Sequence, residues 1–327
     1  MSRLFSFSLL IFLSTINFHT TLFGQQSAID KNVELISREK LRTHVFVLAD
    51  STFKGRASGT PGSIAAGNYI RQCFYGYGLQ PFFDNSYFQN FRAGNFLARN
   101  VAAFVRGRVY PDEYVVVSAH YDHLGELNGT IYPGADDNAS GVALLLQLAE
   151  VFGKRMQAGD APARSIIFVA YDAKEHNLAG SDYFSRTLRV LPFDIIANLN
   201  IDQIGCVLEP PNQNPEYVLV LGADYPSPDL RRIIDVANRY NKINLEIEYT
   251  YYGSMDFSDL FFQLGDQVHL YKRRVPSILY TSGIHAHTYK STDKPTLLDY
   301  EVLAKRTQLL YLVADDLASR RSWLRRY

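Results

Sequence analysis

Acidic and imidazole side chains follow several apolar runs of this chain, at the places where buried strands would end. His120 and Asp122 close the run that starts at Tyr114, and because they lie two residues apart they would share one face of a strand. Glu175 follows the next such run, and Asp202 follows a third. Imidazole nitrogens and carboxylate oxygens are common protein ligands of divalent metals, so the pattern predicts one metal site.

A turn rich in small residues adds two more carboxylates between the first and second of these runs. It reads PGADDNASG over residues 133–141 and lies directly before a helical pattern. Acids at a helix start often serve only as caps, and Asp137 or Asn138 could fill that role here. Capping does not explain why the acidic pair lies just downstream of His120, so we expect one of the two acids to belong to the metal site.

The segments that would position these side chains alternate between strands and helices. Apolar or alternating stretches predict strands at 87–91, 100–106, 114–119, 165–171, 194–201, 217–221 and 277–282. Helical spacing of apolar residues predicts helices at 29–50, 63–75, 138–154, 229–240 and 300–319, and a loop region is expected at 243–272. This alternation is typical of an α/β protein, and we expect a single-domain, three-layer αβα architecture with a mostly parallel central sheet. Ligands of such sheets bind beyond the carboxyl ends of the strands, where the candidate ligands lie.

Composition and the first residues of the chain indicate an exported globular protein. The 327 residues are 47% apolar and carry 33 basic and 33 acidic side chains, so no excess of charge points to nucleic acid. Residues 1–24 combine Arg3 with a short apolar stretch, which favours a cleaved signal peptide over a membrane anchor. We therefore expect a periplasmic or secreted domain over residues 25–327, without stable membrane insertion after cleavage. Cys73 and Cys206 could form one disulfide or remain two buried thiols.

The motifs occur in an order that is similar to that of one known family. GRASGTPGS, SAHYDH, GADDNASG, the turn at Glu175, NIDQIG and VPSILYTSG follow one another with its spacing. Over nearly its whole mature length the chain resembles the bacterial leucyl-type aminopeptidases, which use two co-catalytic zinc ions. Glutaminyl cyclases, glutamate carboxypeptidases and the transferrin-receptor ectodomain share that fold. The resemblance implies the zinc-aminopeptidase (phosphorylase/hydrolase-like) fold, zinc as the cofactor, and a peptide as substrate or ligand.

The resemblance also implies a role for each candidate ligand. His120 and Asp202 would hold a first zinc ion, and Asp136 would bridge both ions. Glu175 would hold the second ion. Asp122 would lie behind His120 and orient its imidazole ring. A cis peptide bond would follow Asp136.

Two positions depart from the family's motif. In the family the metal-binding glutamate is preceded by a second glutamate that acts as general base, and here Lys174 stands before Glu175. An ammonium group has no lone pair with which to accept a proton. The family's last zinc ligand is a histidine four residues before an aspartate, and counting back from Asp293 gives Tyr289. A local shift of the chain could instead bring His287 into this position.

Both departures fall on the second metal position, and together they predict one zinc ion rather than two. Lys174 would supply the positive charge of the missing ion. We predict an exported metallopeptidase that hydrolyses peptides as an aminopeptidase does, by metal-activated water, with altered activity. The alternative is an inactive pseudo-peptidase that binds a peptide, a glycan or a partner protein. A glutaminyl cyclase is a third possibility, although that class also keeps the general-base glutamate.

Overall fold

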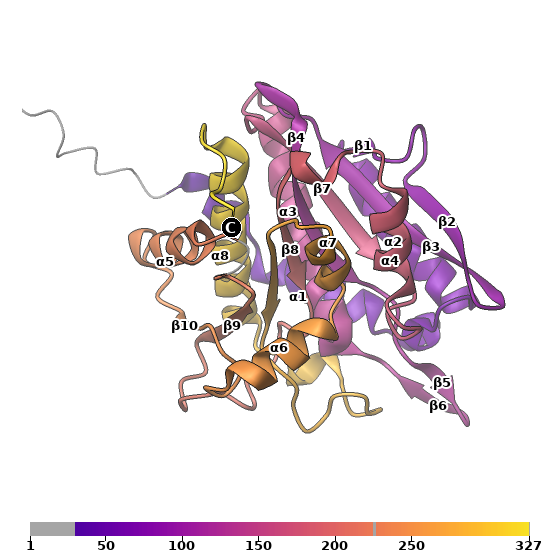
Figure 1. Ribbon diagram of the computed structural model, residues 1–327. Helices are drawn as coiled ribbons and strands as arrows, with labels where there is room; N and C mark the ends of the chain where they lie inside the picture. Colours follow the sequence, from indigo (N-terminus) through magenta and orange to yellow (C-terminus); the bar gives the residue numbers. More distant parts are fainter. Residues whose placement is uncertain (1–29, 225–226, 327) are drawn as a thin grey trace, which may run out of the picture.

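The computed structural model describes residues 30–224 and 227–326 (Figure 1). The leader expected at residues 1–24 lies outside these described residues. Across the described ranges, no helix is both long enough and apolar enough to cross a membrane.

A mixed sheet of nine strands forms the centre of the described part of the chain. In spatial order the strands are β1 (Gln80–Pro81), β3 (Phe96–Val105), β7 (Arg164–Tyr171), β4 (Tyr110–His120), β8 (Ile195–Ile201), β11 (Ser277–Thr281), β9 (Tyr217–Leu221) and β10 (Glu246–Glu248), and β2 (Phe88–Ala93) pairs with β3. The four central strands β7, β4, β8 and β11 are parallel. Towards the edges β3 runs antiparallel to β7, and β9 runs antiparallel to β11. The expected parallel arrangement therefore holds in the centre of the sheet, where the candidate ligands are.

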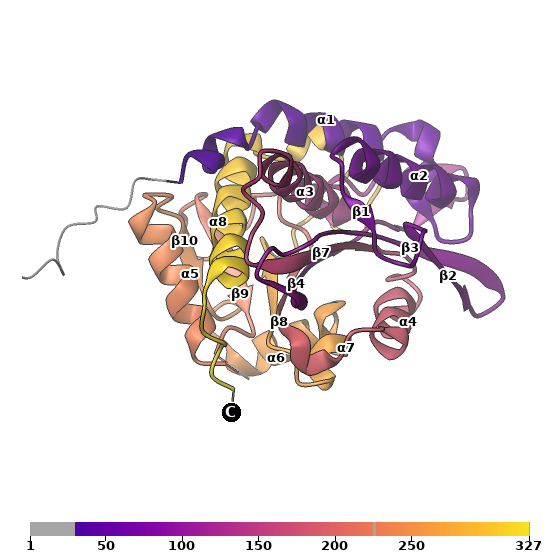
Figure 2. The same cartoon turned by 90° about the horizontal axis from the view of Figure 1, so that it is seen from above.

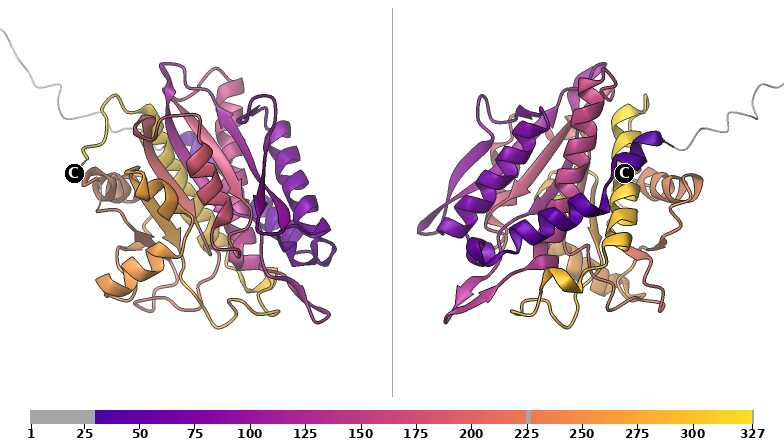
Figure 3. Two further views of the ribbon diagram at one scale, coloured as in Figure 1. Left: turned by 45° about the vertical axis from the view of Figure 1, so that its right-hand side comes forward. Right: turned by 180° about the vertical axis from the view of Figure 1, so that it is seen from behind.

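Helices cover both faces of this sheet and give the expected three layers, as Figure 2 shows. One face is covered by α1 (Arg38–Leu48), α2 (Pro61–Gly76), α3 (Gly141–Gln157) and α8 (Tyr300–Ser319), which lie in front in the right-hand view of Figure 3. The other face is covered by α4 (Ala179–Thr187), α6 (Met255–Gln263) and α7 (Gln267–Lys272). Helix α5 (Asp229–Tyr240) packs beside α8.

Helix α3 lies in the core because it is apolar on nearly every side. All of its residues from Gly141 to Gly153 are buried, which is typical of a helix enclosed by a sheet and other helices. It packs against α1, α8 and the central strands β4 and β7. The helix begins at Gly141 and not at Asn138 as predicted, because residues 135–140 form an irregular turn. This turn lies beside the candidate site.

The region 243–272, expected as a loop, contains β10, α6 and α7. Its aromatic side chains pack mainly on the outer part of the sheet. Tyr251 and Phe262 are buried against Leu219 of β9 and Leu279 of β11. Burial of these two rings therefore attaches this region to the sheet.

The carboxyl ends of β4, β7 and β8 meet at one edge of the sheet because these neighbouring strands are parallel. His120, the last residue of β4, pairs with Tyr171, the last residue of β7, and Ala119 pairs with Ile201, the last residue of β8. A hairpin of β5 (Gly125–Leu127) and β6 (Thr130–Tyr132) projects beyond this edge (Figure 1). The sheet thus delivers the polar residues that follow each strand to one place.

Candidate metal centre

Three side chains converge beyond the ends of β4 and β8. Nε2 of His120 lies 3.1 Å from Oδ1 of Asp202 and 3.4 Å from Oδ1 of Asp137. The His120 ring is buried, and its Nδ1 donates to the backbone carbonyl of Asp122 at 3.1 Å. This hydrogen bond leaves Nε2 as the nitrogen that faces the two carboxylates, which is the tautomer a metal ligand needs.

The acidic residue in this cluster is Asp137, not Asp136 as predicted. The Asp136 carboxylate points to a different group: its Oδ1 accepts from the backbone N–H of Gly205 at 2.6 Å, and its Oδ2 lies 3.2 Å from Nε2 of His285. The buried thiol of Cys206 lies in the same group. Neighbouring residues of an irregular turn point to different sides, and the sequence pattern alone did not distinguish the two acids.

The turn that carries Asp137 is held by hydrogen bonds from three directions. The Asp293 carboxylate accepts from the backbone N–H groups of Asp136 and Asp137 at 2.9–3.1 Å. The Asn138 side chain donates to the carbonyl of Ile201 at 2.9 Å and accepts from the backbone N–H of Gln203 at 3.0 Å. The cis peptide bond joins Asp137 to Asn138, one residue later than predicted.

Asp122 lies behind His120, as predicted, and also holds the strand end that carries the next two site residues. Its two carboxylate oxygens accept from the backbone N–H groups of Lys174 and Glu175 at 3.0 and 3.1 Å. Oδ2 also accepts from the hydroxyl of Ser58 at 3.2 Å. Asp122 therefore fixes the relative positions of the first ligand and of the Lys174–Glu175 pair.

The ammonium group of Lys174 lies in the middle of the cluster. Its Nζ is 3.1 Å from Oε1 of Glu175, 3.7 Å from Oδ1 of Asp137 and 4.0 Å from Oδ2 of Asp202. Nζ also donates to the hydroxyl of Tyr289 at 3.2 Å. Only 7% of the Lys174 side chain is exposed. A single side-chain cation thus lies within 4.0 Å of three carboxylates, two of which, those of Glu175 and Asp202, were predicted metal ligands.

Tyr289, not His287, reaches the site. The imidazole of His287 turns to the hydroxyl of Thr292, 2.8 Å from its Nδ1. The Tyr289 ring stacks on that of His123 with centroids 6.2 Å apart, and its hydroxyl meets Lys174. The ungapped register that gives Tyr289 at the last ligand position is therefore the one the loop adopts.

Burial and neighbouring charges together shift the pKa values of the ionisable groups in the cluster. Burial opposes ionisation of Asp137, yet Lys174 and His123 hold its pKa well below the usual range. Burial also disfavours the Lys174 ammonium, but the three carboxylates around it hold its pKa well above the usual range. For Glu175 burial dominates over the attraction of Lys174 and raises its pKa to about 7.

The residues around His120 fit a zinc ion, since ligand atoms of His120, Asp137 and Glu175 lie within 4.8 Å of one another, whereas the second position has lost one donor. Both oxygens of Asp137 are buried without a hydrogen-bond partner, an arrangement that calls for a cation. Nε2 of His120 and a carboxylate of Asp202 complete a nitrogen–oxygen donor set suited to zinc. At the second position the donor expected from a histidine is replaced by Tyr289, and Nζ of Lys174 binds Glu175 at 3.1 Å.

Sequence reasoning missed a buried arginine that shapes the site. The fully buried guanidinium of Arg56 donates to the backbone carbonyls of Leu48, Tyr121, Pro133 and Gly134 at 2.6–2.9 Å. These carbonyls belong to three separate segments, including the one after His120 and the one before the Asp137 turn. Arg56 was present in the GRASGTPGS motif, but its contacts are with backbone atoms far along the chain, which no local pattern encodes.

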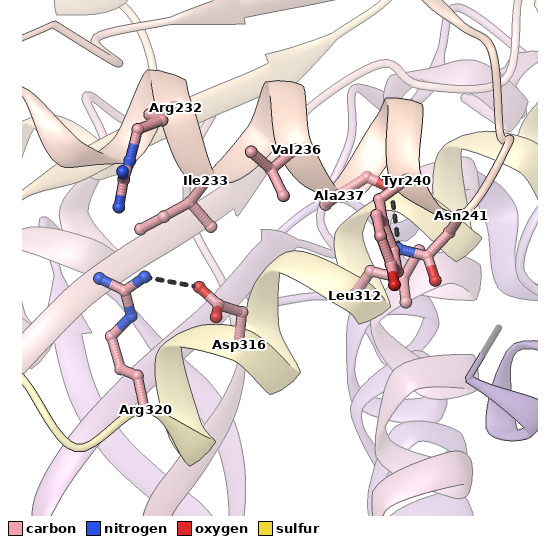
Figure 4. A pocket seen from close by; sticks show the side chains of 9 residues that line it. All are labelled: Arg232, Ile233, Val236, Ala237, Tyr240, Asn241, Leu312, Asp316 and Arg320. Carbon is pink, nitrogen blue, oxygen red and sulfur yellow. Dashed lines mark hydrogen bonds and ion pairs between the residues drawn. The ribbon is translucent and has the colours of Figure 1, made fainter. Parts of the chain in front are cut away.

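One groove of the described surface, away from this cluster, lacks a comparable set of metal ligands. A groove of about 420 Å³ between α5 and α8 is lined by Ile233, Val236 and Leu312, with the ion pair Asp316–Arg320 at one end (Figure 4). It contains one carboxylate and no histidine or cysteine. The cluster at the strand ends is therefore the candidate metal centre.

A central sheet covered by helices on both faces, with an imidazole and carboxylates at its strand ends, is typical of one class of metal-dependent hydrolases. The chain belongs to peptidase family M28, whose model matches residues 100–314. A probable zinc metalloprotease of Pyricularia oryzae is 39% identical over 109 residues, covering 32% of this chain and 21% of that protein. Transferrin receptor protein 2 of Mus musculus is 27% identical over 168 residues, covering 51% of this chain and 18% of that protein.

Solved structures agree with the fold. The aminopeptidase LapA of Legionella pneumophila superposes with a TM-score of 0.69 at 17% identity, over 91% of this chain and 76% of that chain. The matched part amounts to only about a fifth of the length of the curated relatives. The relatives and the solved structures therefore support the family, the fold and zinc as the metal. They do not by themselves give the activity of this chain.

Proposed function

We propose that this chain is an exported hydrolase of peptides that uses one zinc ion, held by His120, Asp137 and Asp202. The observation that carries the proposal is the position of the Lys174 ammonium, within 4.0 Å of Glu175, Asp137 and Asp202. Membership in peptidase family M28 supports peptides as the substrate class. Export rests on the composition of residues 1–24.

The charge of the cluster favours one zinc ion over two. Asp137, Glu175 and Asp202 contribute three negative charges when ionised, and Lys174 contributes one positive charge. A single divalent ion therefore neutralises the cluster, with His120 bound as a neutral ligand. A second divalent ion would leave two excess positive charges in a largely buried site, beside an ammonium group that cannot leave.

The zinc ion, Glu175 and Lys174 would have different roles in hydrolysis. A zinc ion supplies a Lewis acid that polarises a peptide carbonyl and acidifies water. Lys174 cannot accept a proton while it is an ammonium, so Glu175 is the carboxylate left to do so. Lys174 keeps Glu175 in place through their 3.1 Å contact.

Metal analysis combined with a peptide digest tests this proposal. We expect about one zinc ion per chain after dialysis against zinc, and slow cleavage of mixed peptides detected by mass spectrometry. The variants His120→Ala and Glu175→Gln should both lose cleavage, and only His120→Ala should lose zinc. Two zinc ions per chain, or cleavage that survives His120→Ala, would contradict the proposal.

A second candidate is a metal-free binding protein, which the same ammonium group favours. Because Lys174 already contacts all three carboxylates, the cluster has an internal counter-ion without any metal. In that case no zinc should remain after dialysis, and peptides should bind without being cleaved. The two candidates therefore differ in one elemental measurement on the purified chain.

A further inference from the structure

The carboxylates of the candidate metal centre are all engaged by groups of the protein or by its proposed zinc ion. Glu175 contacts Lys174, and Asp137 and Asp202 are the proposed zinc ligands. Asp122 accepts from two backbone N–H groups. On the projecting hairpin, Glu126 pairs with Lys54 at 3.3 Å. A free amino terminus carries a positive charge and binds best to an acidic group that no other cation neutralises, and the charges of Glu175, Asp137 and Asp202 are shared with Lys174 and the proposed zinc ion.

Tyr289 brings a hydrogen-bond donor to the same place. The Lys174 ammonium donates to the oxygen of Tyr289, so the hydroxyl proton of Tyr289 must point to another acceptor. Tyr289 is 47% exposed, whereas Lys174 is nearly buried, so the tyrosine hydroxyl is the donor within reach of a ligand. A carbonyl oxygen matches this donor, and an ammonium group does not.

We propose that the site accepts peptides whose α-amino group is acylated, either blocked or part of an internal peptide bond, and disfavours free amino termini. The proposal rests on the single-zinc function above and specifies its substrate class. The acyl carbonyl oxygen accepts the hydroxyl proton of Tyr289. A free α-ammonium in that position faces the like charge of Lys174 at short range. This preference differs from the aminopeptidase type that the motifs predict, and the binding experiment below decides between the two.

The binding of two matched ligands to the zinc-loaded full chain tests this preference. Leucinamide and N-acetyl-leucinamide differ only in acylation of the amino group, and isothermal titration calorimetry measures their affinities without any turnover. We expect the acetylated ligand to bind at least about tenfold more tightly. Tyr289→Phe should weaken its binding by about tenfold and leave that of leucinamide unchanged, since the variant removes a donor and no charge.

Two variants at Lys174 test whether its positive charge or its side-chain shape causes the preference. Lys174→Gln should strengthen leucinamide binding by at least about tenfold, because it releases Glu175 to meet the ammonium group. Lys174→Arg keeps the charge and should keep the preference for the acetylated ligand. Thermal unfolding of each variant shows whether it is folded before its affinities are compared.

The outcomes distinguish this inference from the proposed function. Equal or tighter binding of leucinamide by the unmodified protein overturns the inference, and so does the absence of binding by both ligands. Zinc content is measured on the same samples. A chain that prefers the acetylated ligand but holds no zinc contradicts the single-zinc function and supports the substrate preference. A chain that holds one zinc ion but prefers leucinamide supports the single-zinc function and contradicts the substrate preference.

Discussion

Lys174 donates a hydrogen bond to Tyr289, with Nζ 3.2 Å from the phenol oxygen, although 115 positions separate the two residues in the chain. These are the two residues that depart from the motif of the zinc aminopeptidases. Their contact shows that the two departures lie side by side, with the cation between its hydrogen-bond acceptor Tyr289 and the carboxylate of Glu175.

Reversing both departures should restore a second metal. In the double variant Lys174→Glu/Tyr289→His, two metal donors replace the ammonium and the phenol, next to Glu175. We expect the zinc content to rise from about one to about two ions per chain, measured by elemental analysis after dialysis. The double variant Lys174→Gln/Tyr289→Phe removes the same two groups without adding strong donors. A second ion in that control would show that mere removal of Lys174 suffices.

The two adjacent aspartates should differ sharply in zinc binding. Asp137→Asn removes a carboxylate 3.4 Å from Nε2 of His120 and should weaken zinc binding by at least about tenfold. Asp136→Asn removes a carboxylate that contacts Gly205 and His285, and should destabilise the fold by about 1–3 kcal/mol with zinc affinity unchanged. Titration against a zinc-competing dye measures the affinities. Loss of zinc in Asp136→Asn alone would restore the assignment first made from the sequence.

Removing the Lys174 charge should destabilise the metal-free protein more than the zinc-loaded protein. Without zinc, Lys174→Met removes the ammonium that lies within 4.0 Å of three carboxylates, and breaking such a buried contact costs about 3 kcal/mol. Bound zinc should recover part of this loss because it neutralises two of the carboxylates. Urea unfolding with and without a chelator measures both values. An equal loss in the two forms would indicate that Lys174 acts only through packing.

His44 should make the fold less stable in mild acid, independently of the metal centre. Burial lowers its pKa to about 4, and its ring lies between the hydroxyls of Tyr69 and Tyr77. In the unfolded chain the pKa is about 6.5, so between pH 6.5 and 4 the unfolded state binds more protons. Stability is therefore complete above pH 6.5 and falls by about 3 kcal/mol as the pH drops to 4.

The variant His44→Gln measures this contribution. Its free energy of unfolding should depend less on pH across that window than that of the unmodified protein. The variant His176→Gln, at an exposed position, supplies the control. An unaltered slope in His44→Gln would mean that the acid sensitivity arises elsewhere.

The ends of the buried strands could be predicted from the sequence because their signals are strong and local. Apolar runs precede His120, Glu175 and Asp202, and parallel pairing of these runs brings their ends together. Helices with clear apolar spacing were also predicted closely, and 229–240 and 300–319 match α5 and α8 residue for residue.

Other parts of the site depend on backbone geometry that no residue pattern specifies. Whether Asp136 or Asp137 faces His120 is decided by the irregular turn at 135–140, which Asp293 holds from the far end of the chain. The contacts of Arg56 are with carbonyl groups, which every residue has. Long-range bonds to the backbone leave no signature in the identity of the residue that accepts them.

Because Lys174 supplies one positive charge of the cluster, the fraction of chains with a complete centre would depend differently on the free zinc concentration. A cation attached to the chain is present once in every molecule, needs no binding equilibrium and is not removed by a chelator. A centre that assembles two ions from solution is completed in proportion to the square of the free zinc concentration when zinc is scarce. One of the two cations of this centre belongs to the chain, so the fraction of complete centres would rise in proportion to the free zinc concentration itself. More of the centres would therefore hold zinc where zinc is dilute.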